Sequence, residues 1–242
     1  MIHIIKSAPP EELMRLKKCA EEQGLTDKEG YEKLGNPLKE VVRQSLLREQ
    51  GHLCAYCMRS IPDDRIHEED ADLSDVYIEH WYARGAMNNT GENKGLDYSN
   101  MLAVCSGNEK APEAPGKRKK RYFTCDKKRG SAPLTINPLD LTTLDTLYYS
   151  SDGMIKSTDK RIENDINVKL NLNLSSDAVA LPQHRKAVLD EVQQDIYSQP
   201  GDMLQNCKNQ LAIWEKETDP KTPYIGIAIW WLKDQIKALS QA

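Results

Sequence analysis

Residues 54–130 open with Cys54-Ala55-Tyr56-Cys57, and Ile78-Glu79-His80 follows further along. Next comes Tyr98-Ser99-Asn100-Met101-Leu102-Ala103-Val104-Cys105, and the stretch ends at Thr124-Cys125-Asp126-Lys127-Lys128-Arg129-Gly130. These cysteines bracket the acidic–histidine pair Glu79-His80 and Asn100, a combination that is hard to explain by packing alone. We therefore expect residues 54–130 to be built around a metal site, with the rest of the chain as a mainly helical frame.

The composition is that of a soluble globular protein. With 242 residues, 39% of them apolar and 29% charged, the chain is long enough to bury a proper core. Its net charge of -4 predicts no polyanion partner, so nucleic-acid binding would depend on local basic patches. The longest apolar run, residues 225–232, is much shorter than the roughly 20 residues that cross a bilayer. The start, Met1–Lys6, is too short for a signal peptide, and we expect a cytoplasmic protein with no membrane partner.

Four cysteines have the spacing of a structural zinc site. In a reducing compartment, paired cysteines favour metal binding over disulfides. The pair Cys54 and Cys57 lets one tight turn present two thiolates to a tetrahedral ion. The second pair, Cys105 and Cys125, is divided by an insert. We predict a four-cysteine Zn²⁺ site with no open position for catalysis, and the alternative is a set of unrelated buried thiols.

A second group of polar residues has the chemistry of an active site. Val76-Tyr77-Ile78 predicts a short strand, so the side chains of Glu79 and His80 should diverge at its end. An imidazole can take a proton from water near neutral pH, and a carboxylate suits Mg²⁺. Asp126 would add a second hard oxygen from the following helix. Alone, such a dipeptide is usually a surface pair or a hydrogen-bonded core histidine, and its place between the cysteine pairs favours function.

The remaining patterns predict an α+β fold that is mainly helical, in three regions: a helical segment 1–50, a core 51–157 and a helical region 158–242. The expected elements are a short strand at 2–6, helices from Pro9-Pro10 to Gly24 and over 37–49, a hairpin over 147–156, helical patterns from Asp159, and a last helix over 224–239. The remaining cysteines, Cys19 and Cys207, lie on helical patterns and are expected to be buried.

One strongly basic stretch lies inside the insert. Its cations are Lys117, Arg118, Lys119, Lys120 and Arg121, with Lys127, Lys128 and Arg129 beyond. Such side chains contact phosphates without choosing a sequence, and Tyr122 and Phe123 would stack on bases. A charge run is usually a solvated loop, but its insertion between two predicted metal ligands favours nucleic-acid binding.

The order of these motifs resembles the HNH (ββα-metal) endonuclease motif. More narrowly, it is similar to the PtuB-like HNH nucleases of Septu and retron antiphage defence systems. The resemblance continues in the segments 134–139 and 170–173 and covers most of residues 40–240. It implies a zinc-stapled HNH core embedded in a helical scaffold.

The resemblance also implies roles for individual residues. His80 would be the general base that activates water, and Glu79 a ligand of the catalytic Mg²⁺ or Mn²⁺. Asn100 matches the central asparagine, which supports the loop and orients the base. Asp126 stands where the family usually has His or Asn as the last metal ligand. Arg129 stands at the usual Lys position and would contact a phosphate.

Relatives in this family act on nucleic acid, and DNA and tRNA both stay open as substrates. They work with an ABC-type ATPase (PtuA-like), and some are coupled to a retron reverse transcriptase and its msDNA. Two other functions fit the same residues. One is a non-catalytic zinc module that binds nucleic acid or a partner protein, and the other is a stand-alone restriction-type enzyme.

Overall fold

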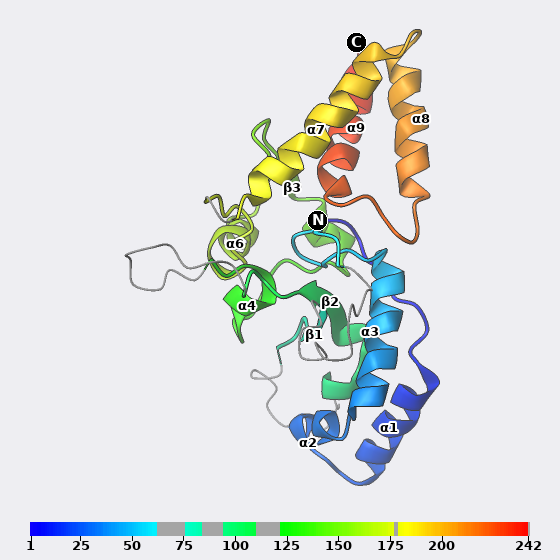
Figure 1. Ribbon diagram of the computed structural model, residues 1–242, viewed down its shortest axis with the longest axis vertical. Helices are drawn as coiled ribbons and strands as arrows, with labels where there is room; N and C mark the ends of the chain where they lie inside the picture. The colour runs from blue at the N-terminus through cyan, green and yellow to red at the C-terminus, as the bar shows by residue number, and fades with distance from the viewer. Residues whose placement is uncertain (62–75, 84–93, 110–121, 177–178, 242) are drawn as a thin grey trace, which may run out of the picture.

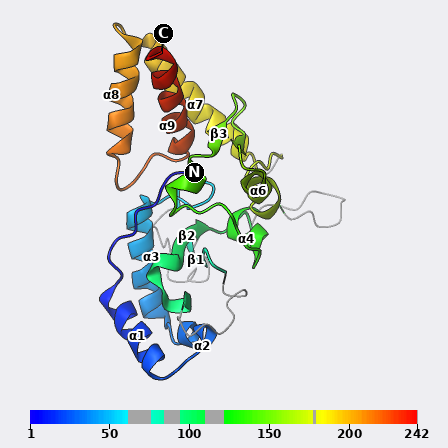
Figure 2. The same cartoon turned by 180° about the vertical axis from the view of Figure 1, so that it is seen from behind.

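The computed structural model describes residues 1–61, 76–83, 94–109, 122–176 and 179–241. The fold is α+β and mainly helical, with two small antiparallel sheets. Figure 1 shows one group of helices at each end of the molecule, with the first sheet and α4 between them. The view from behind in Figure 2 has the same arrangement. Among the described residues, no helix combines the length and the apolar character needed to cross a membrane.

The N-terminal group contains α1 (Glu11–Glu22), α2 (Asp27–Glu32) and α3 (Asn36–Gln50). The predicted helices α1 and α3 are confirmed, and α3 ends at Gly51, whose φ of 61° is left-handed. The short helix α2 was not expected. It begins with a capping box, in which the Thr26 side chain accepts from the backbone N–H of Glu29 and the Glu29 carboxylate accepts from that of Thr26.

Two expectations for this end of the chain are wrong. Residues 2–6 form no strand. The backbone N–H of Ile4 donates to the carbonyl of Pro138 at 2.9 Å, but proline has no N–H to donate in return, so no ladder extends there. Cys19 is exposed on α1, where its sulfur accepts a hydrogen bond from Gln23 at 3.0 Å. Cys207 is buried, as expected.

The central sheet pairs β1 (Val76–His80) with β2 (Met101–Cys105) in antiparallel register, with His80 opposite Met101. Every residue of β2 is buried, because α3 packs on this strand and α4 (Cys125–Arg129) lies beside it. Short helical turns η3 (Lys94–Leu96) and η4 (Tyr98–Asn100) lead into β2. The sequence prediction that Glu79 and His80 end a strand is therefore confirmed.

The chain then forms the short helix α5 (Leu141–Leu144), which was not expected, and the predicted hairpin of β3 (Leu147–Tyr149) and β4 (Ile155–Ser157). The helical region follows: α6 (Lys160–Asn164), the π-helical turn η5 (Asp165–Lys169), α7 (Leu181–Ser198), α8 (Met203–Glu215) and α9 (Ile225–Leu239). Helix α9 packs against α7 and α8. Buried apolar residues from all three predicted regions, such as Leu46, Met101 and Ile227, belong to one continuous core.

Candidate functional site

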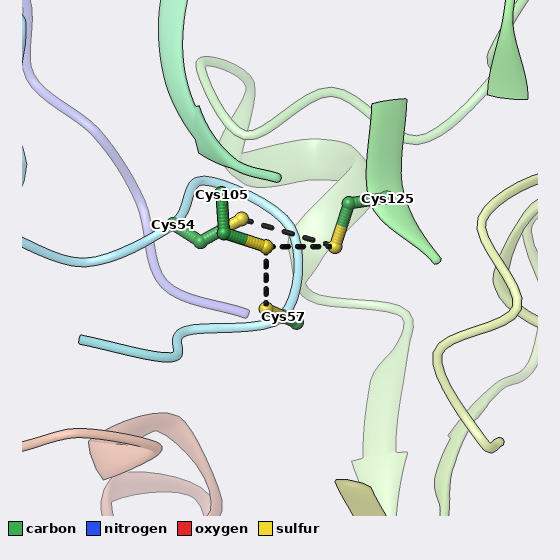
Figure 3. Close-up of side chains that lie close together, drawn as sticks. All are labelled: Cys54, Cys57, Cys105 and Cys125. Atoms are coloured by element: carbon green, nitrogen blue, oxygen red, sulfur yellow. Dashed lines mark hydrogen bonds between the residues drawn. The ribbon is translucent and has the colours of Figure 1, made fainter. Parts of the chain in front are cut away.

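Four buried cysteines meet at the centre of the molecule (Figure 3). Cys54 and Cys57 lie on the turn after α3, Cys105 ends β2, and Cys125 begins α4. The Met58 N–H donates to the Cys54 carbonyl at 3.0 Å, which closes the turn that carries the first pair. The structure thus brings together the four residues that the spacing selected.

The separations of the sulfurs fit a tetrahedral metal. With metal–sulfur bonds of about 2.3 Å, a tetrahedron of thiolates has edges of about 3.8 Å. The Sγ atoms of Cys54 and Cys125, of Cys57 and Cys105, and of Cys105 and Cys125 are each 3.8 Å apart. All four Sγ atoms lie within 4.8 Å of one another, and none forms a disulfide. These residues can hold a metal ion such as zinc.

Hydrogen bonds among the thiols shift the pKa values of Cys54 and Cys125 in opposite directions. Burial opposes ionisation of Cys54, but hydrogen bonds with Cys105, Cys125 and Cys57 outweigh it and hold the pKa of Cys54 well below its usual range. The pKa of Cys125 is raised well above its usual range, first by its hydrogen bond with Cys105 and then by those with Cys54 and Cys57. Ionisation of one thiol thus disfavours ionisation of its neighbours. A bound cation would offset this effect, because metal binding favours the thiolate form of each ligand.

A buried glutamine fastens the cysteine turn to the sheet. Gln50 donates to the carbonyls of Leu53 and Ala103 at 2.8 Å and accepts from the Ala103 N–H at 2.8 Å. The Ala55 N–H also donates to the Ala103 carbonyl, at 3.1 Å. Gln50 was not singled out from the sequence. The signal that could have identified it is a polar residue on the apolar side of a helix, just before the cysteine pair.

Glu79 and His80 point to opposite sides of the end of β1, and each has a defined set of partners. Glu79 is buried and forms an ion pair with Arg129, while the Tyr56 hydroxyl donates to Oε1 of Glu79 at 3.1 Å. Burial raises the pKa of Glu79 to about 8, the nearby Asp126 carboxylate adds to the rise, and Arg129 opposes it. Glu79 and Asp126 therefore form a pair of acidic groups that a divalent cation would suit.

The His80 ring is buried in the protein. Its side chain packs edge-on against Tyr31 of α2, with ring centroids 5.1 Å apart, and the residue is 2% exposed. Nε2 of His80 is 3.0 Å from the carbonyl oxygen of Gly95. A carbonyl can only accept, so Nε2 carries the proton, and in the neutral ring the lone pair is on Nδ1. Tyr31 and Gly95 were not predicted to take part in the site.

Asn100 ties together the loops that flank β1 and β2. Its side chain accepts from the Tyr82 N–H at 2.7 Å and donates to the carbonyls of Tyr82 at 3.2 Å and Lys94 at 3.4 Å. Its own carbonyl accepts from the Trp81 N–H at 2.9 Å. This geometry suits the supporting role implied for Asn100 by the resemblance.

We expect Asn100→Ala to lower the free energy of unfolding by about 1–3 kcal/mol, because the N–H and C=O of Tyr82 lose their side-chain partner. Thermal unfolding followed by circular dichroism measures the loss. Asn206→Ala is the matched control, because the Asn206 side chain donates a solvent-exposed hydrogen bond to the Pro200 carbonyl at 3.3 Å. Equal stability of Asn100→Ala and the wild type would contradict the bridging role.

The position of Arg129 corrects the expectation that it contacts a phosphate. Arg129 is 4% exposed, and its guanidinium donates to the carbonyls of His80 at 3.0 Å and Ala132 at 2.9 Å, besides pairing with Glu79. Nη1 also donates to the Tyr56 hydroxyl at 3.2 Å. Arg129 thus holds Glu79 in place from inside the protein.

The predicted nucleic-acid contacts are described only in part. Lys117, Arg118, Lys119, Lys120 and Arg121 lie outside the described residues. Lys128 is exposed at the end of α4, and Lys127 pairs with Glu109. Tyr122 packs against the core, so its ring is only partly available for stacking.

No protein-family model matches this chain, and no curated protein matches it significantly. The site itself, rather than a relative, must therefore support any function.

Proposed function

We propose that the protein is a metal-dependent HNH endonuclease that hydrolyses phosphodiester bonds of nucleic acid. One observation carries the proposal. The antiparallel pair β1–β2 is followed by the short helix α4. His80 ends β1 and Asn100 directly precedes β2 at the same end of the sheet, while Asp126 of α4 is close enough to Glu79 to raise its pKa. The cysteine cluster joins β2 and α4 to the turn after α3, which fits a structural Zn²⁺ that fixes these parts of the unit.

His80 is the general base of the proposed reaction. Its Nε2 proton faces the Gly95 carbonyl, so Nδ1 takes the proton of the attacking water. The water oxygen then bonds to phosphorus, and the bond to the leaving oxygen breaks. Asn100 keeps the loop in the position that this attack requires.

Glu79 and Asp126 would hold the catalytic Mg²⁺ or Mn²⁺. Mg²⁺ in proteins is commonly bound by one or two carboxylates, with waters and substrate phosphates in the other positions. When bound, the ion polarises a phosphoryl oxygen and stabilises the leaving oxygen. Arg129 and Tyr56 position one carboxylate oxygen of Glu79.

Exposed Lys128 supports contact with a phosphate backbone, and the basic run 117–121 belongs to the same proposal. DNA and tRNA are both candidate substrates, because attack by water does not need a 2′-hydroxyl. We further propose that the nuclease acts in the bacterial cytoplasm as an antiphage effector with an ABC-type ATPase (PtuA-like), and that a retron reverse transcriptase and its msDNA are optional partners.

A non-catalytic zinc module that binds nucleic acid or a partner is the second candidate function. It is favoured by the burial of Glu79 and His80, which are only 7% and 2% exposed. In that case the acidic pair and His80 would serve only to stabilise the fold.

The test is cleavage of plasmid DNA and total tRNA in Mg²⁺ or Mn²⁺, with and without the ATPase. We expect Asp126→Ala to reduce cleavage by at least about 100-fold, since metal stabilisation of transition-state charge contributes several kcal/mol. Asp190→Ala, which removes an exposed carboxylate of α7, is the matched control.

Brief chelation should stop cleavage, and Mg²⁺ added without Zn²⁺ should restore it. Binding of nucleic acid without cleavage in either metal, with or without the ATPase, would favour the zinc module. Cleavage that does not need the ATPase would favour the stand-alone enzyme.

A further inference from the structure

A zinc ion held by four thiolates carries two negative charges in excess, since four negative charges meet two positive ones. The cysteines that would hold it are buried, and a buried charge is costly unless cations or hydrogen bonds compensate it. This reasoning rests on the structural zinc site of the proposed function and is independent of the nuclease reaction. Cations near the cluster would therefore stabilise the metal-bound form by compensating its negative charge.

Arg185 of α7 is a buried cation. It is 1% exposed, and its guanidinium donates to the Gly153 and Leu172 carbonyls at 2.6 and 2.9 Å and to Oδ1 of Asn173 at 3.0 Å. Within the described part of the chain, no carboxylate forms an ion pair with it. Neutral acceptors satisfy its hydrogen bonds but leave its charge uncompensated.

The turn that accepts from Arg185 also touches the cysteine cluster. The Cys125 N–H donates to the Leu170 carbonyl at 2.9 Å, two residues before the Leu172 carbonyl that binds Arg185. Burial lowers the pKa of Arg185, and the ionisable groups of Tyr149 and Cys57 act in the opposite direction. Arg185 is thus within electrostatic reach of the cluster.

Arg59 lies in the turn that carries the first cysteine pair. It follows Cys57 by two residues, and its carbonyl accepts from the Cys54 N–H at 2.9 Å. The Arg59 side chain also forms a hydrogen bond with Tyr224, so both its backbone and its side chain have partners at the turn that carries the first cysteine pair and at the segment before α9.

We propose that Arg59 and Arg185 are the outer-shell cations that neutralise the metal–tetrathiolate centre. Two guanidinium charges balance the two excess negative charges. Because Arg185 belongs to α7 and Tyr224 precedes α9, the same contacts link the metal centre to the C-terminal helices. The Tyr224 N–H donates to the Met58 carbonyl at 2.9 Å, in the turn that carries Cys57.

The experiment measures metal affinity directly. The full-length protein is loaded with Co²⁺, whose thiolate charge-transfer band reports the four-sulfur site, and Zn²⁺ affinity is read by competition with a chromophoric chelator. We expect Arg185→Gln and Arg59→Gln each to weaken Zn²⁺ binding by about tenfold or more, the usual effect of losing an outer-shell partner. Arg185→Lys and Arg59→Lys, which keep the charge, should retain most of the affinity. Arg161→Gln, at an exposed ion pair with Asp159, is the control.

The outcomes separate this inference from the proposed function. If the wild type binds neither Co²⁺ nor Zn²⁺ through its thiols, the structural zinc site is wrong. If the wild type binds and the Gln variants bind equally well, only the role of the arginines is overturned. Equal losses in the Lys and Gln variants would also overturn it, because hydrogen bonding rather than charge would then be responsible. If Arg185→Gln does not fold, the partly exposed Arg59 decides the matter alone.

Discussion

His80→Gln should reduce cleavage by about 10²–10⁴-fold, the usual contribution of a general base, while the protein keeps its fold and its metal. Glutamine can still donate a hydrogen bond to the Gly95 carbonyl and fill the space beside Tyr31. It has no group that takes a proton from water near neutral pH. The substitution therefore removes the proposed chemistry and keeps most of the packing.

His3→Gln is the matched control. The Nε2 atom of His3 also faces a backbone carbonyl, that of Leu139 at 3.3 Å, but His3 belongs to the segment before α1 and not to β1, β2 or α4. Cleavage is measured with each variant at equal metal content, and thermal unfolding is recorded in parallel. We expect His3→Gln to cleave like the wild type. Equal cleavage by His80→Gln and the wild type would assign the activity to another site or to a contaminant.

The parts of the site that could be predicted from the sequence are those whose chemistry is local. The spacing of Cys54 and Cys57 describes one turn, and the β-branched and aromatic residues before Glu79 describe one strand. The pattern over 37–49 likewise predicted α3 to within one residue at each end. In these segments, local propensity and tertiary packing favour the same structure.

The parts that could not be predicted depend on contacts between distant segments. From the sequence, Arg129 is one of several consecutive cations and was expected to contact a phosphate at the surface. In the structure it is buried, where it pairs with Glu79 and donates a hydrogen bond to the Tyr56 hydroxyl. Helix α2 is too short to show a periodic pattern, although the capping box of Thr26 and Glu29 was readable in the sequence. The role of α2 as the support for His80 through Tyr31 becomes visible only in three dimensions.

Cys54→Ser should remove the bound metal and lower the melting temperature by at least about 10 °C. Structural zinc contributes about 10–16 kcal/mol of apparent binding free energy in small peptides, and about 1 kcal/mol shifts the melting temperature of a chain of 150–250 residues by about 2–4 °C. The effect should be large here because the turn after α3, the end of β2 and the start of α4 meet at the sulfurs. Metal content by mass spectrometry and unfolding by calorimetry give the two readouts.

Cys19→Ser is the control, because Cys19 is exposed on α1, where its sulfur accepts a hydrogen bond from Gln23. It should retain both the metal and the melting temperature of the wild type. A Cys54→Ser protein that keeps its metal would show that the remaining thiols bind without Cys54. One that loses its metal but unfolds like the wild type would mean that the apolar core, which includes Leu46, Met101 and Ile227, stabilises the central unit by itself. The cysteines themselves belong to that core, so the size of the shift measures how far the metal, rather than packing, holds the turn after α3, β2 and α4 together.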